Sequence, residues 1–162
     1  MGRLSRLETI ERTIEVGDRV LLDTTVLAAY LDPAETTHPV ARHVVDDLVG
    51  TGRNPAVVSM VTVMELLVRP LRASPPSHYT VLAFLRHHPN LEPIPLDLRM
   101  AQEAASLRAT HRLSPPDALI VATGIASQVA HLVTNDDAWA KKLAVLEDRI
   151  GVVTIGRFLA AS

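Results

Sequence analysis

Short runs of apolar residues alternate along this chain with longer segments whose apolar positions recur at helical spacing. The short runs lack the polar alternation of a half-exposed strand, so they predict strands buried on both faces. Buried strands separated by helices are typical of a parallel sheet covered by helices on either side. The expected fold is therefore α/β, a three-layer α/β/α sandwich around a central, mostly parallel sheet. The predicted strands cover 20–22, 56–58, 91–96, 131–133 and 151–155, and the predicted helices cover 24–31, 39–49, 62–68, 77–88, 98–111, a segment starting at 114, and 136–143.

The length of 162 residues suits one domain, preceded by a segment of different character. Residues 1–18 are interpreted as an N-terminal extension that forms a short amphipathic helix, and residues 19–162 as the domain itself. The extension carries apolar residues at helical spacing among charged ones, namely Leu4, Leu7, Ile10 and Ile14.

Composition excludes several classes of protein. The chain has no cysteine, which excludes a disulfide scaffold, a thiolate metal site and a cysteine nucleophile. No apolar run approaches the roughly 20 residues that cross a bilayer, and the first residues lack the apolar core of a signal peptide. A cytoplasmic protein with no membrane segment is expected. The net charge of −2 means that any nucleic-acid binding would depend on a local basic patch or on metal ions.

Four acidic residues recur where a predicted strand gives way to a helix. Asp23 and Asp136 follow two of the strands, and Glu65 and Asp117 lie on the first turn of two helices. Ligands of open parallel sheets bind outside the carboxyl ends of the strands, so these carboxylates are expected to converge there. Ligands that offer only oxygen favour Mg²⁺ or Mn²⁺. A divalent ion in such a cluster suits phosphodiester hydrolysis.

Helix capping is the alternative interpretation of the same acids. Three short stretches match a capping box, in which the acid stabilises the start of a helix: Thr62 with Glu65, Ser114 with Asp117, and Thr134 with Asp137. Each cap would contribute about 1 kcal/mol and needs no function. Asp23 directly closes an apolar strand and matches no such box. The match of Asp137 leaves Asp136 as the better ligand candidate of that pair.

Four stretches of the chain resemble, in order and spacing, the motifs of the PIN-domain nucleases. They are Leu21-Leu22-Asp23-Thr24-Thr25, Ser59 through Glu65-Leu66, Leu113-Ser114-Pro115-Pro116-Asp117-Ala118, and Leu132-Val133-Thr134-Asn135-Asp136. The resemblance spans residues 20 to about 155. It implies the strand order 3-2-1-4-5 and a Mg²⁺- or Mn²⁺-dependent ribonuclease site. It also implies that Asp23, Asp117 and Asp136 hold metal, while Glu65 completes the catalytic set.

Small proteins of this family are often the toxin of a bacterial VapBC-type toxin–antitoxin pair. The resemblance therefore implies an RNA substrate, a small antitoxin that blocks the site, and a homodimer. Two features depart from the family pattern, namely the segment 1–18 before the first strand and the slightly acidic net charge.

Candidate substrate contacts are the cations close to the predicted acids, with solvated surface side chains as the alternative interpretation. They are Arg69, Arg72, Lys141 and Lys142. Arginine grips phosphate through two donors, and lysine acts as a point charge. Two further functions compete with the nuclease. A catalytically silent PIN-like binding module would lack one of the acids, and a haloacid-dehalogenase phosphatase would need an acid at Thr25.

Overall fold

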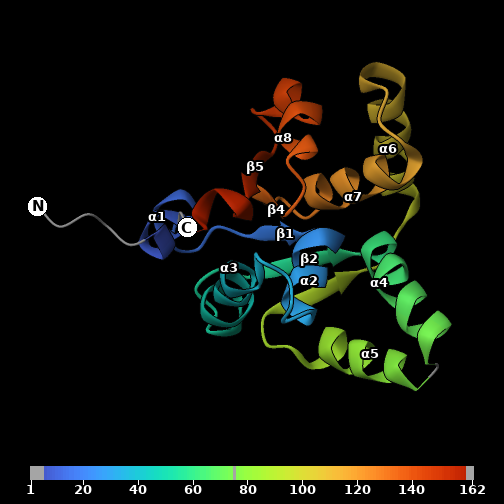
Figure 1. Ribbon diagram of the computed structural model, residues 1–162. Helices are drawn as coiled ribbons and strands as arrows, with labels where there is room; N and C mark the ends of the chain where they lie inside the picture. The colour runs from blue at the N-terminus through green and yellow to red at the C-terminus, as the bar shows by residue number, and fades with distance from the viewer. Residues whose placement is uncertain (1–5, 75, 160–162) are drawn as a thin grey trace, which may run out of the picture.

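A computed structural model describes residues 6–74 and 76–159 as a five-stranded sheet between two layers of helices (Figure 1). All neighbouring strands are parallel, in the order β3-β2-β1-β4-β5. The strands are β1 (Val20–Leu22), β2 (Ala56–Ser59), β3 (Leu91–Ile94), β4 (His131–Thr134) and β5 (Gly151–Thr154). The three-layer prediction is confirmed, and so is the strand order that the family resemblance implied.

Alternate residues of the central strands bury their side chains in two separate cores. In β1, Val20 and Leu22 join one core and Leu21 joins the other. All three are fully buried, which explains why the strand has no polar position. One core is covered by α1 (Arg6–Thr13), α2 (Thr24–Leu31), α3 (His38–Arg42), η1 (His43–Gly50) and α5 (Ser77–His87). The other core is covered by α6 (Leu98–His111), α7 (Pro115–Ala126) and α8 (Ala138–Lys142). Helix α4 (Met60–Ala73) contributes side chains to both cores.

Several helices differ from their predicted extents. The segment predicted as one helix over 39–49 is an α-helix, α3, that continues as the π-helix η1. Helix α4 is longer than predicted and passes through Pro70. Two short 3₁₀ turns, η2 (Ala144–Leu146) and η3 (Ile155–Phe158), flank β5. No helix within the described ranges is long and apolar enough to span a bilayer.

Helix α1 belongs to the packed body of the protein. Ile10 and Ile14 are fully buried, and α1 contacts η3. The guanidinium of Arg53 donates to the carbonyl oxygens of Glu11 at 2.7 Å and Ile14 at 2.9 Å. These bonds satisfy carbonyl groups that the end of a helix leaves without partners. Leu4 of the predicted amphipathic series lies outside the described residues.

Candidate active site

Asp23 stands at the carboxyl end of β1 and is 2% exposed. Its oxygen Oδ1 accepts hydrogen bonds from the backbone N–H groups of Thr25 at 3.0 Å and Val26 at 3.1 Å. Asp23 is thus the N-cap of α2, a role that the sequence analysis did not give it. The extended backbone of a residue that closes a strand is also the conformation of an N-cap. One side chain therefore ends β1 and starts α2.

Burial raises the pKa of Asp23 above its usual range, because the charged form loses its hydration. Hydrogen bonds from Thr134, Val26 and Thr25 favour the charged form without offsetting burial. Within the described chain, no lysine, arginine or histidine forms an ion pair with Asp23. A buried carboxylate without a cationic partner is costly, so this position favours a cation.

Glu65 reaches the same end of the sheet from α4. The helix begins at Met60 and is capped by Ser59, so Thr62 is already inside it. The capping box predicted for Thr62 and Glu65 is therefore wrong. Instead, the carboxylate of Glu65 accepts a hydrogen bond from the hydroxyl of Thr24, which also lies 3.3 Å from the hydroxyl of Thr62. Since Thr24 follows Asp23 in the chain, Glu65 and Asp23 are neighbours at the end of β1.

Asp136 connects to Asp23 through the last residue of β4. The hydroxyl of Thr134 donates to Oδ2 of Asp23 at 2.7 Å and accepts from the backbone N–H of Asp136 at 2.9 Å. The side chain of Asp136 accepts from the N–H of Ala138 at 2.9 Å, so it supports the start of α8. Asp137 is exposed and makes no capping hydrogen bond. The predicted capping role of Asp137 is therefore wrong. The carboxylate that accepts a backbone N–H at the start of α8 is that of Asp136, one residue earlier.

Asp117 lies on the first turn of α7 and forms an ion pair instead of a reciprocal cap. The hydroxyl of Ser114 accepts the backbone N–H of Asp117 at 3.3 Å, which confirms half of the predicted capping box. The carboxylate turns to α8, where its Oδ2 lies 2.9 Å from Nζ of Lys142. The sequence analysis placed Lys142 among the phosphate contacts and contained no signal of this pair, whose members are 25 residues apart.

The acids share one edge of the sheet but do not surround one point. Threonine hydroxyls link Glu65 to the chain next to Asp23, and Asp23 to Asp136. Asp117 is held by Lys142. Across the described residues, no three His, Cys, Asp or Glu side chains are grouped as ligands of one metal ion. The donor set itself suits Mg²⁺ or Mn²⁺, since it is purely oxygen, and the charge on Asp23 lacks a cation.

Threonines are the functional side chains that the sequence analysis missed. The carboxylates are held in place by the hydroxyl groups of Thr24, Thr25 and Thr134. The hydroxyl oxygens of Thr25 and Thr134 are 3.1 Å apart. The signal was visible, because Thr24 and Thr25 directly follow Asp23 and Thr134 ends the fourth strand. Threonine hydroxyls both donate and accept, which suits them to bridge neighbouring carboxylates.

The remaining predicted substrate contacts are exposed. Arg69 and Arg72 lie on the outer side of α4, and Lys141 lies on α8. None of the three takes part in an ion pair within the described ranges. Their charges are free to meet an anion that approaches this edge of the sheet.

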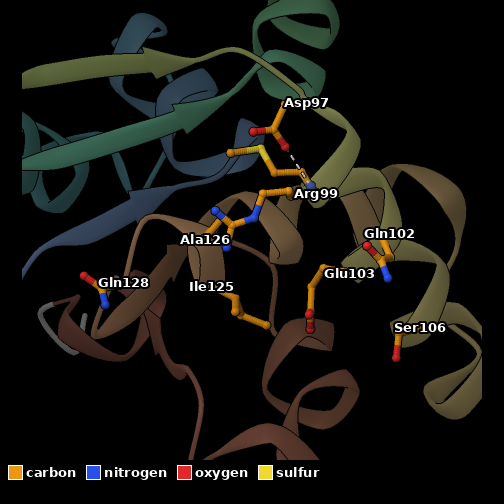
Figure 2. A pocket seen from close by; sticks show the side chains of 9 residues that line it. Asp97, Arg99, Gln102, Glu103, Ser106, Ile125, Ala126 and Gln128 are labelled. Atoms are coloured by element: carbon orange, nitrogen blue, oxygen red, sulfur yellow. Dashed lines mark hydrogen bonds between the residues drawn. The ribbon is translucent and has the colours of Figure 1, made fainter.

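An open cavity of about 730 Å³ lies elsewhere, between α6 and the last turn of α7. Figure 2 shows Arg99 and Glu103 of α6 facing Ile125 and Ala126 of α7. Asp117 is on the first turn of the same helix, and a helix advances about 1.5 Å per residue. The cavity is thus separated from Asp117 by most of the length of α7 and contains none of the predicted site residues.

Three solved structures with the same fold were compared with this chain. A toxin–antitoxin complex from Klebsiella pneumoniae is 23% identical, with a TM-score of 0.64, and the match covers 84% of this chain and 97% of the other. FitAcB from Neisseria gonorrhoeae is 19% identical, with a TM-score of 0.62 and coverage of 85% and 98%. The toxin VapC20 of Mycobacterium tuberculosis, which cleaves the sarcin–ricin loop, is 15% identical, with a TM-score of 0.60 and coverage of 75% and 93%.

The sequence was also compared with curated proteins and with family models. No curated protein matches it. The model of the PIN domain matches residues 20–145, which is more than half of the chain and includes all four acids. The matched region runs from the first residue of β1 to η2. The chain therefore belongs to the PIN domain family.

Proposed function

We propose that this protein is a metal-dependent endoribonuclease, the toxin of a bacterial type II toxin–antitoxin pair. The observation that supports this most directly is Asp23, a buried carboxylate without a cationic partner at the carboxyl end of the central strand. The hydroxyl of Thr134 connects it to Asp136, and Glu65 accepts a hydrogen bond from the hydroxyl of Thr24, the next residue in the chain. A site of this composition suits a divalent cation and a phosphodiester substrate.

In this proposal Asp23, Asp117 and Asp136 would hold Mg²⁺ or Mn²⁺, and Glu65 completes the catalytic set. A bound ion would supply the attacking hydroxide and offset negative charge on the phosphorane-like transition state. The chain's own part is positional. The cap of α2 fixes Oδ1 of Asp23 against two backbone N–H groups. Thr134 fixes Oδ2, and it also fixes the backbone of Asp136.

Phosphate groups of the RNA would meet the exposed cations at the rim. Arg69 and Arg72 extend from the same helix as Glu65, so their guanidinium groups can bind RNA phosphates on one side of the scissile bond. Lys141 offers a point charge from α8. Because the net charge of the chain is −2, these local cations and the bound ion carry the attraction to RNA.

The first experiment is cleavage of a mixed RNA panel by the purified protein with Mg²⁺, with Mn²⁺ and with EDTA. We expect cutting only with metal. Asp117→Asn and Asp136→Ala should lower the rate at least about a hundredfold, because each removes several kcal/mol of charge stabilisation. The matched control is Asp137→Ala, which removes an exposed carboxylate one residue away and should keep the rate. Cutting that survives EDTA or both site variants would refute the proposal. Absence of both cutting and metal binding would favour the silent binding module.

A small antitoxin protein and a cytoplasmic location complete the proposal. The Klebsiella relative is a toxin–antitoxin complex, and a VapBC complex from Salmonella typhimurium is bound to DNA. An antitoxin that covers the carboxylate edge would keep RNA away from Asp23. We propose a cytoplasmic location because the RNA of a bacterial cell is there.

We further propose a homodimer that forms through α4. Three large apolar side chains on this helix are exposed at spacings of four and three residues, namely Met64 at 58%, Val68 at 40% and Leu71 at 47%. Such a stripe pairs well with the same stripe of a second copy, because both partners bury apolar surface and the spacing matches a helix–helix contact. The stripe adjoins Glu65, so a dimer would place two sites near one interface.

Light scattering after size exclusion should therefore give twice the chain mass of 17.6 kDa. Val68→Glu should give a monomer, because it places a charge in the apolar interface. Val145→Glu makes the same change at a valine of η2 that is 66% exposed, and it should leave the dimer intact. A dimer that tolerates Val68→Glu would mean that another surface joins the copies.

A further inference from the structure

Lys142 is held in place by two contacts from different parts of the fold. Its Nζ lies 2.9 Å from Oδ2 of Asp117 and 5.0 Å from the centroid of the Trp139 ring. Trp139 is 3% exposed, so the ring is fixed in the core and gives the ammonium a rigid platform. The side chains of Lys142 and Asp117 are 37% and 21% exposed. The two contacts orient the ammonium, while the Lys142 side chain itself remains exposed and Asp117 is partly buried.

The pair occupies a carboxylate oxygen that the proposed metal site needs. Lys142 is the last residue of α8, which starts two residues after Asp136, and its ammonium reaches across to α7, which carries Asp117. Asp117 makes no hydrogen bond to the network around Asp23 and Asp136, whose members are joined through Thr134. The lysine is thus the charge partner of an acid that no hydrogen bond joins to that network.

We infer that Lys142 is an internal counter-ion that competes with the divalent cation for Asp117. This inference rests on the proposed metal site. An ammonium and a divalent ion cannot share one carboxylate oxygen at close range, because the two cations repel each other strongly at a few ångströms. Metal binding through Oδ2 of Asp117 therefore requires Lys142 to leave that oxygen. Lys142 is a positioning residue that sets the metal concentration at which the site fills.

The neighbouring lysine provides a matched control. Lys141 is exposed, takes part in no ion pair within the described chain, and carries the same charge one residue earlier. Removing Lys141 changes the net charge by the same amount without freeing Asp117. A difference between the two lysines therefore isolates the contact from the general electrostatic effect.

The test is a calorimetric titration of Mn²⁺ into the RNA-free protein, with affinity as the readout. We expect Lys142→Met to bind Mn²⁺ roughly three- to tenfold more tightly than wild type, since it removes the competing charge. Lys141→Met should change the affinity by less than about twofold. Lys142→Arg keeps the charge beside Asp117 and should bind as wild type does. Melting curves check that each variant is folded, and Lys142→Gln replaces Lys142→Met if the latter is not.

Each outcome separates this inference from the metal site itself. Equal affinity of wild type and Lys142→Met, with binding abolished by Asp117→Asn, would keep the metal site and overturn the role of Lys142. Weaker binding by Lys142→Met would overturn it as well. Absence of Mn²⁺ binding in wild type, Lys142→Met and Lys142→Gln at millimolar concentrations would overturn both the inference and the proposed metal site.

Discussion

Asp23→Asn is expected to lower RNA cleavage by about a hundredfold to a thousandfold while the protein stays folded. The charge of Asp23 is the part of the site that asparagine removes, and several kcal/mol of transition-state stabilisation correspond to about 10²–10³ in rate. The shape stays, because the amide oxygen still accepts from the N–H groups of Thr25 and Val26. The amide nitrogen takes the place of Oδ2 and donates to the hydroxyl of Thr134.

The same variant should melt at a temperature equal to or above that of wild type at neutral pH, measured in EDTA. Because burial raises the pKa of Asp23, the folded protein binds this proton more tightly than the unfolded chain does. The stability that protonated Asp23 contributes to the wild type is therefore lost as the pH rises through the raised pKa. The variant has no carboxylate at this position and so does not lose stability in this way. The two melting temperatures should approach each other near and below pH 3.8, the ordinary pKa of an aspartate side chain.

Asp97→Asn is the matched control for this variant. Asp97 is also an N-cap, accepting from the N–H of Met100 at 2.8 Å at the start of α6, and it is exposed. The substitution should leave cleavage unchanged. An Asp23→Asn protein that cuts RNA at the wild-type rate would remove Asp23 from the site. An Asp23→Asn protein that melts below wild type at high pH would mean that the folded protein stabilises the charged carboxylate of Asp23.

The second large effect concerns stability at α1. Ile10→Ala and Ile14→Ala should each lower the free energy of unfolding by about 2–5 kcal/mol, because each leaves a cavity around a fully buried side chain. For a chain of this length, 1 kcal/mol corresponds to roughly 2–4 °C in melting temperature. Thermal melting and denaturant titration measure the loss. Deletion of residues 1–14 should act in the same direction and leave Arg53 without its two carbonyl partners.

Val16→Ala controls for composition, since this valine is 76% exposed and only two residues from Ile14. Its effect should stay within about 0.5 kcal/mol. Unchanged melting of Ile10→Ala, Ile14→Ala and the deletion would show that α1 is detached from the body in solution. RNA cleavage should persist in all of them at temperatures where they are folded, because α1 carries none of the four acids.

The strands could be predicted from sequence because the physical cause is local. Buried parallel strands such as Val20–Leu22 need apolar side chains on both faces, and that need appears directly as an unbroken apolar run. The proline-containing strand β3 lies at an edge of the sheet, which is where a strand with a missing backbone N–H is tolerated. The π-helix η1 has no comparable local signal, since its apolar spacing resembles that of an α-helix, so one predicted helix became two elements.

The site was predictable in its residue types more than in its contacts. The acids Asp23 and Asp136 stand out because acidic residues just after apolar strands are few. A motif for capping, however, looks the same whether or not a cap forms. Glu65 matched the motif and makes no cap, whereas Asp23 matched none and is one. Contacts such as Lys142 with Asp117 depend on how α7 and α8 lie against each other. That arrangement follows from tertiary packing, which sequence spacing does not encode.

The position of β1 has a consequence for when the proposed nuclease site can form during synthesis. This strand lies between β2 and β4, and its residue Leu22 pairs with Val133 of β4. A nascent chain that ends before β4 carries Asp23 and Glu65 but leaves one side of β1 unpaired and lacks Asp136. Such long-range pairing is slow to form, because the intervening chain must first be ordered. The proposed nuclease site of the emerging polypeptide therefore stays incomplete until β4 inserts beside β1.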